Sequence, residues 1–183
     1  MSTRCRDRRR AQRSRGFSYV ANRDARVLVL GSLPGVRSIA AQQYYAQPQN
    51  AFWRIMGQLV GAGTELGYAT RLRRLKASGI ALWDVAAAAE RPGSLDAAIV
   101  RASVVANDFA GFFARHRRIG RVYFNGAKAE ELYRKLVLPG LAEPFASLPT
   151  ARLPSTSPAH AAMPYARKLE AWSVVVDSLR DDQ

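Results

Sequence analysis

A short apolar run from Val27 to Leu30 leads directly into the loop Gly31–Gly35, and this junction constrains the fold more than any other stretch of the chain. Four consecutive apolar residues followed by a glycine predict a buried strand that ends in a tight loop. Glycine at this place also permits close approach of the backbone to a ligand. Ligand sites in open α/β sheets lie at the carboxyl ends of strands, so we expect the chemistry of this protein here.

Strand-length runs and helical patterns alternate along the rest of the chain. The further strands that we predict are 80–85, 121–124 and 151–153. The spacing of apolar residues predicts helices at about 37–42, 51–60, 69–77, 107–116, 129–136 and 162–179. This alternation predicts an α/β fold, a three-layer α/β/α sandwich with a central, mainly parallel four-stranded sheet. The aromatic residues that we expect in its core, rather than at a ligand, are Phe109, Phe112, Phe113, Tyr133 and Trp172.

The composition indicates one domain with a polyanionic partner. The chain has 183 residues, of which 48% are hydrophobic, and a net charge of +14. Seven arginines give residues 1–16 a net charge of +6, which leaves +8 on the remainder, so the domain itself is basic. Such a domain suits nucleic acid or an anionic membrane surface. We expect residues 1–16 to be a disordered basic tail, and residues 17–183 to form the domain.

Cysteine usage and hydropathy exclude several classes of protein. The single cysteine, Cys5, rules out an internal disulfide framework, a cysteine zinc site and a cysteine-ligated iron–sulfur cluster. The sequence contains neither an apolar run of membrane-spanning length nor the apolar core of a secretory signal. We therefore expect a cytoplasmic protein that uses no metal and no cofactor.

Polar or glycine-rich positions follow each of the four predicted strands, and in a parallel sheet these positions meet at one edge. They are the loop 31–35, Asp84, Asn125 with Gly126, and the loop 154–160. The hydroxyl-rich fourth loop precedes a helix, where hydroxyl and N–H groups can hold phosphate. The amides of Asn50 and Asn125 can read the edge of a base, while an aromatic ring such as Tyr45 can stack on its face. Together these residues predict a nucleobase pocket beside a grip on the phosphate backbone.

Several short motifs occur in order along the domain. They are Gly31-Ser32-Leu33-Pro34-Gly35 with Ser38, Gln43-Tyr44-Tyr45-Ala46, Pro48, Asn50, Phe52-Trp53, Gly79-Ile80-Ala81-Leu82-Trp83-Asp84-Val85, Gly93-Ser94-Leu95-Asp96, Asn107-Asp108-Phe109, Phe124-Asn125-Gly126 and Leu153-Pro154-Ser155-Thr156-Ser157-Pro158-Ala159. In these motifs the chain resembles the hypoxanthine-DNA glycosylase family of the uracil-DNA glycosylase superfamily. The resemblance implies the uracil-DNA glycosylase-like fold and, in base excision repair, hydrolytic removal of a deaminated base from DNA, hypoxanthine above all.

The resemblance also implies roles for individual residues. Asn50 would orient the attacking water, because Leu33 stands where many superfamily members carry Asp or Asn. The residues implied to bind the base are Gly31, Ser32, Leu33, Tyr45, Phe52 and Asn125. The loop implied to grip the backbone and enter the vacated stack comprises Pro154, Ser155, Thr156, Ser157, Pro158, Ala159 and His160. Asp84 is a second catalytic candidate, as a general base, although bonding to loop N–H groups is its more ordinary role.

Departures from the family pattern leave alternatives open. Gln47 and Gln49 stand where family members typically have His and Arg, so one alternative is a catalytically weak DNA-binding protein of the same fold. A uracil- or mismatch-specific glycosylase is the other. Lys128 follows the third strand, but a lysine at a helix start is usually solvated, so we expect no lyase activity. The expected partner is single- or double-stranded DNA, bound by a monomer that is associated with the nucleoid.

Overall fold

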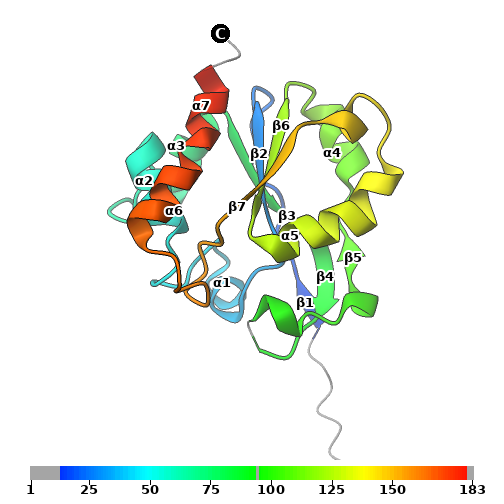
Figure 1. Ribbon diagram of the computed structural model, residues 1–183, viewed down its shortest axis with the longest axis horizontal. Coiled ribbons are helices and arrows are strands. Elements are labelled where there is room, and N and C mark those ends of the chain that lie inside the picture. The colour runs from blue at the N-terminus through cyan, green and yellow to red at the C-terminus, as the bar shows by residue number, and fades with distance from the viewer. Residues whose placement is uncertain (1–12, 94, 181–183) are drawn as a thin grey trace, which may run out of the picture.

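The computed structural model describes residues 13–93 and 95–180, and it shows a four-stranded sheet between two layers of helices (Figure 1). Its strands are β2 (Val27–Gly31), β3 (Ile80–Asp84), β6 (Arg121–Asn125) and β7 (Thr150–Leu153), in the order β3-β2-β6-β7. All three pairings are parallel. The predicted fold class is confirmed, and every predicted strand end lies within one residue of the observed one.

Helices cover both faces of this sheet (Figure 1). One face carries α2 (Phe52–Val60), α3 (Tyr68–Ala77), α6 (Tyr165–Trp172) and α7 (Val174–Arg180), and the other carries α4 (Phe109–Arg115) and α5 (Ala127–Leu132). The short elements are α1 (Val36–Ala41), η1 (Asp96–Ala98), η2 (Arg101–Ser103), the π-helical η3 (Tyr133–Val137), η4 (Leu138–Gly140) and η5 (Phe145–Ser147). The last predicted helix is therefore two helices that meet at Ser173. Within the described ranges, none of the helices has the length and apolar character needed to cross a membrane.

The side chains of β2 alternate between two hydrophobic cores, as the period of a strand requires. Val27 and Val29 pack toward α2, α3 and the C-terminal helices, whereas Leu28 and Leu30 pack toward α4 and α5. Because β2 is central and buried on both faces, its sequence is an uninterrupted apolar run. The aromatic residues expected in the core are all buried, namely Phe109, Phe112, Phe113, Tyr133 and Trp172.

A second sheet, antiparallel and three-stranded, is one that the sequence patterns do not predict. It consists of β1 (Arg13–Arg15), β4 (Ala86–Glu90) and β5 (Val105–Ala106), in the order β1-β4-β5. β4 is four alanines and a glutamate, so it lacks the β-branched and aromatic residues that mark strands. β1 lies inside the expected disordered tail, so that expectation is wrong for residues 13–15. Residues 1–12 and Ser94 lie outside the described residues.

The register of the parallel sheet aligns the strand ends that carry polar residues. Gly31 at the end of β2 is paired with Asp84 at the end of β3, and Asn125 at the end of β6 is paired with Leu153 at the end of β7. The four loops that follow these residues therefore leave the sheet at the same edge, which is where the candidate site lies.

Candidate functional site

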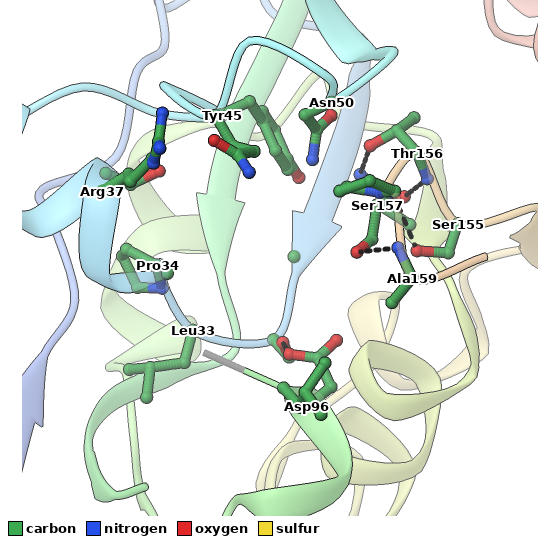
Figure 2. A pocket seen from close by; sticks show the side chains of 18 of the residues that line it. Leu33, Pro34, Arg37, Tyr45, Asn50, Asp96, Ser155, Thr156, Ser157 and Ala159 are labelled. Atoms are coloured by element: carbon green, nitrogen blue, oxygen red, sulfur yellow. Dashed lines mark hydrogen bonds between the residues drawn. The ribbon is translucent and has the colours of Figure 1, made fainter. Parts of the chain in front are cut away.

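A cavity of about 580 Å³ opens at this edge, which is within the size range of small-molecule sites. Figure 2 shows Tyr45 and Asn50 on one side of the cavity, Asp96 opposite them, and the loop from Ser155 to Ala159 on a third side. The other predicted site residues that line it are Gly31, Ser32, Leu33, Asp84, Asn125, Thr156, Ser157, Pro158 and His160. The loops after all four strands of the parallel sheet thus contribute to one site.

Two predicted site residues, Phe52 and Pro154, are not among those that line the cavity. The ring of Phe52 is fully buried and stacks on Tyr45, with ring centroids 4.2 Å apart and an interplanar angle of 28°. Phe52 therefore supports Tyr45 from behind, and its predicted direct contact with a base is corrected to a supporting one. The carbonyl of Pro154 accepts a hydrogen bond from Trp172 Nε1 at 2.9 Å, so Pro154 anchors the start of its loop.

Tyr45 is held in a conformation that costs energy. Its φ is 53°, in the left-handed region, which disfavours residues with a side chain by roughly 1–2 kcal/mol. Its hydroxyl is buried and has no hydrogen-bond partner among the described residues. Burial, together with the nearby charge of Asp84 and against an opposing interaction with the Asn125 side chain, raises the pKa of Tyr45, so the hydroxyl keeps its proton at neutral pH. Tyr45 therefore lines the cavity as a neutral phenol, with its hydroxyl enclosed close to Gly31.

Gly31 lines the cavity at a place where there is no room for a side chain. A Cβ atom added at Gly31 would lie 2.3 Å from Oδ1 of Asp84 and 3.1 Å from the hydroxyl of Tyr45. The first distance is far below any van der Waals contact, so a side chain would displace the carboxyl group. The absence of a side chain at Gly31 thus lets the polar ends of Asp84 and Tyr45 approach the same stretch of backbone.

Arg91, for which the sequence gives no functional signal, holds the loop 31–35 in place. Its side chain is 3% exposed and donates hydrogen bonds to the carbonyl oxygens of Leu33, at 3.2 Å, and of Pro34. The Leu33 side chain packs beside Ala86 and Ile99 in a small third core, which holds the loop from its other side. An arginine next to proline and glycine in a stretch that reads as a loop gives no sequence signal of such a role.

Two carboxyl groups, those of the buried Asp84 and the half-buried Asp96, line the cavity in unlike surroundings. Asp96 accepts a hydrogen bond from Ser32 Oγ at 2.7 Å. Burial raises the pKa of Asp96, while the bond from Ser32 and the charge of Arg91 act in the opposite direction. Asp84 is 3% exposed, and its Oδ2 atom has no hydrogen-bond partner among the described residues. Burial, aided by the charge of Asp96 and opposed by that of Arg91, raises the pKa of Asp84 to about 8.

Asn50 is oriented by the start of α2. Its Oδ1 atom accepts a hydrogen bond from the backbone N–H of Phe52 at 3.0 Å, which fixes the plane of the amide. In Figure 2 the amide group of Asn50 stands at the margin of the cavity next to Tyr45. An amide held in this way can offer its Nδ2 hydrogens and the second lone pair of Oδ1 to a ligand or a water molecule.

The hydroxyl-rich loop after β7 is fixed at three points. Asn125 Nδ2 donates to Thr156 Oγ1, and the Thr156 N–H donates to Asn125 Oδ1, both at 2.8 Å. The Thr156 carbonyl also accepts from the Ala51 N–H at 2.9 Å. Lys168 Nζ donates to the carbonyl of His160 at 2.8 Å and so holds the far end of the loop. Each half of the Asn125 amide is therefore already engaged once, and it has one remaining N–H and one remaining lone pair for a base.

Two further titratable residues, Lys128 and His116, do not line the cavity. Lys128 Nζ forms an ion pair with Glu131 at 2.8 Å and does not line the cavity. His116 is buried at the end of α4, where its Nδ1 lies 2.9 Å from the carbonyl of Phe112. No group of three His, Cys, Asp or Glu side chains within residues 13–93 and 95–180 is arranged to hold a metal ion.

Unpartnered polar atoms are concentrated at this cavity. Five buried side-chain atoms lack a hydrogen-bond partner in the described part of the chain, and three of them belong to lining residues: Tyr45 Oη, Gln47 Oε1 and Asp84 Oδ2. Leaving such an atom unpaired costs roughly 1–3 kcal/mol. This concentration of polar groups around the cavity suits a polar, heteroatom-rich ligand better than an apolar one.

Comparisons with known proteins agree on one superfamily. The family model of the uracil DNA glycosylase superfamily matches residues 17–179. A hypoxanthine DNA glycosylase of Methanosarcina acetivorans is 41% identical over 64% of this chain and 73% of its own length. One of Methanosarcina barkeri is 38% identical over 65% of this chain and 75% of its own. A solution NMR structure from M. acetivorans, described as a candidate uracil DNA glycosylase, superposes with a TM-score of 0.75 at 37% identity, covering 92% of this chain and 99% of that one.

Proposed function

The chain belongs to the uracil DNA glycosylase superfamily, and on this premise we propose that it is a monofunctional glycosylase that removes hypoxanthine from DNA. A base stacked in a duplex cannot reach a cavity, so the nucleotide is first flipped out of the helix. Water then replaces the base at C1′ of the sugar. We also propose that the protein acts as a monomer, in the cytoplasm at the nucleoid, without metal or cofactor.

The observation that carries this proposal is the set of unpartnered atoms on Tyr45, Gln47 and Asp84. A hypoxanthine ring offers an N–H donor together with carbonyl and ring-nitrogen acceptors. It can therefore pair with an amide oxygen and with hydroxyl donors at the same time. An apolar ligand of the same size would leave all three atoms unpaired, at a cost of roughly 1–3 kcal/mol each.

We assign Asn50 to the attacking water. One lone pair of its Oδ1 is occupied by the Phe52 N–H, so the amide cannot rotate freely, and the second lone pair can accept a hydrogen bond from water. Breakage of the N-glycosidic bond places positive charge on the sugar. A water held in line then needs little further activation, because positioning itself supplies a large part of the rate.

We assign the loop from Ser155 to His160 to the DNA backbone and to the space that the flipped base leaves. Its hydroxyl and N–H groups suit phosphate oxygens. The bonds from Asn125 and Lys168 order the loop before DNA arrives, so little conformational entropy is lost on binding. The net charge of +14 favours association with DNA.

The test is base release from oligonucleotides that carry one deoxyinosine, measured as strand cleavage after treatment with alkali. Asn50→Ala should reduce the rate at least about a hundredfold, because positioning of the water is lost, while DNA affinity changes little. Gln58→Ala is the matched control, since Gln58 is an exposed amide on α2, the helix that Asn50 precedes, and does not line the cavity. Full activity of Asn50→Ala would refute the role of Asn50, but the assignment of hypoxanthine as the substrate would stand.

Other outcomes distinguish the alternatives. Release of uracil but not of hypoxanthine would replace the proposed substrate by the uracil-specific alternative. Binding of all these oligonucleotides without release of any base would favour the DNA-binding alternative, which the glutamines at positions 47 and 49 motivate. Strand cleavage without alkali would overturn the monofunctional assignment.

A further inference from the structure

The two carboxyl groups of the cavity differ in a way that assigns them different tasks. Burial raises the pKa of Asp96, but the hydrogen bond from Ser32 and the charges of Arg91 and Lys128 favour its ionised form. Asp84 sits across the sheet register from Gly31, and its enclosed Oδ2 receives no hydrogen bond from any described residue. Pairs of titratable groups whose surroundings push their ionisation apart are the usual sign of an acid and its counterpart.

The groups around Asp84 oppose its ionisation. The titratable side chains that interact with it are those of Asp96, Arg91, Tyr44, Tyr45 and Tyr68. Arg91 is the cation of this set, and its guanidinium is already shared with Asp96 and with the carbonyls of the first loop. Because Asp84 is buried without a hydrogen-bond donor at Oδ2, its neutral form is favoured. Burial, together with the charge of Asp96, raises the pKa of Asp84 to about 8.

The departing base needs a proton. When the bond between C1′ and N9 of hypoxanthine breaks, both electrons leave with the base, and the charge spreads over its ring nitrogens and carbonyl oxygen. A donor aimed at one of these atoms stabilises the charge as it develops. Transfer of a proton from a positioned acid typically contributes a factor of about 100–10,000 in rate.

We propose that Asp84 is the acid of this cavity, whose carboxyl O–H donates to a ring nitrogen or carbonyl oxygen of the extruded base and protonates it as it leaves. The C1′–N9 bond breaks, the base takes the proton of Asp84 and departs neutral, and water forms the new C1′–O bond. The proton that this water loses returns to the Asp84 carboxylate through solvent. This inference rests on the proposed glycosylase function, and it gives Asp84 the opposite task from a general base.

The inference agrees with the enclosed position of Oδ2, because a buried oxygen without a donor disfavours the carboxylate and keeps the carboxyl group protonated. A carboxyl group that already donated to the protein could not donate to a base, and an ionised one could only accept. Beside it, the Tyr45 hydroxyl is a second donor, and the Gln47 Oε1 atom is an acceptor. The cavity thus favours bases with a carbonyl next to a ring N–H, as in deaminated purines. It disfavours adenine, whose amino group donates where hypoxanthine accepts.

The experiment measures single-turnover release of hypoxanthine between about pH 6 and about pH 10, for the wild-type protein, Asp84→Asn and Asp84→Ala. The wild-type rate should be level at low pH and fall about tenfold per pH unit above about pH 8, because the acid form is lost. Asp84→Asn keeps a donor that does not titrate, so its rate should be at least about tenfold lower at neutral pH and level across the range. Asp84→Ala should be slower still. Asp24→Asn, at an exposed carboxylate paired with Arg118, should match the wild type.

Two results would overturn the assignment. If the wild-type rate rises with pH and Asp84→Asn is as inactive as Asp84→Ala, Asp84 is a base. If Asp84→Asn keeps the pH profile of the wild type, its role is structural. Carbon-13 NMR of the aspartate carboxyl groups needs only the wild-type protein, so it does not depend on whether a variant folds. One carboxyl group should titrate near pH 8. If none does, the proposal is refuted. A wild-type protein that releases no hypoxanthine at any pH, with that carboxyl still titrating, would instead reject the proposed function, and this inference with it.

Discussion

Replacing Asp84 by asparagine should stabilise the protein at neutral pH, although it removes a carboxyl group from the cavity. In the unfolded chain the Asp84 carboxyl ionises near its ordinary pKa of 3.8, whereas burial raises the pKa to about 8 in the folded protein. Between these values the folded state binds the extra proton, so stability falls as pH rises through this window. At about 1.4 kcal/mol per pH unit the loss reaches about 4 kcal/mol at pH 7. Asparagine does not titrate and avoids this loss.

The substitution also alters packing, so the informative quantity is how the difference between the two proteins depends on pH. Urea unfolding at about pH 5 and about pH 7 gives the free energy of unfolding of each protein. The difference should shift by about 3 kcal/mol in favour of Asp84→Asn between these two pH values. Asp24→Asn serves as the control and should show no shift of this kind, because Asp24 lies at the surface in an ion pair with Arg118.

A difference that stays constant between the two pH values would refute this reasoning. It would mean that the carboxyl of Asp84 ionises in the folded protein with an ordinary pKa, despite its burial and its unpartnered Oδ2. The outcome does not depend on any substrate, so it tests the electrostatics of the cavity separately from its chemistry.

The remaining predictions concern the loops and DNA. Asn125→Ala removes both hydrogen bonds to Thr156 and should lower the free energy of unfolding, measured in urea, by about 2–4 kcal/mol. It should also weaken DNA binding, measured by fluorescence titration. Unchanged affinity would mean that the loop 155–160 does not contact DNA. Gly31→Ala places a Cβ atom 2.3 Å from Asp84 Oδ1 and so displaces the carboxyl group. Base release should fall at least about tenfold, while the affinity for undamaged DNA stays the same. An equal loss of base release and of DNA affinity would indicate misfolding instead. The logarithm of DNA affinity should decrease linearly with the logarithm of salt concentration, with the same slope for the wild type and Asn50→Ala, since we assign Asn50 to the attacking water and an uncharged amide releases no counterion.

The sequence by itself determines the main sheet and the place of the site. Apolar runs and helical spacing are local signals, so they locate β2, β3, β6 and β7 closely. Parallel topology then brings the ends of these strands together without any further information, which is why Asp84, Asn125 and the loop 155–160 are found at one cavity. The weakest local signals fail first: β4 is nearly all alanine, and β1 lies within an arginine-rich segment.

Only the tertiary structure decides what the individual side chains of the site can do. Phe52 and Tyr45 look equally suited to stack on a base in the sequence, but Phe52 is enclosed behind Tyr45. Arg91 clamps two carbonyl groups that lie more than fifty positions before it in the chain. Asp84 is ordinary as a residue type, and it becomes a carboxyl with a raised pKa because distant segments exclude water and offer its Oδ2 no donor. Desolvation and hydrogen-bond partnership depend on residues far apart in the chain, and a local pattern carries no record of them.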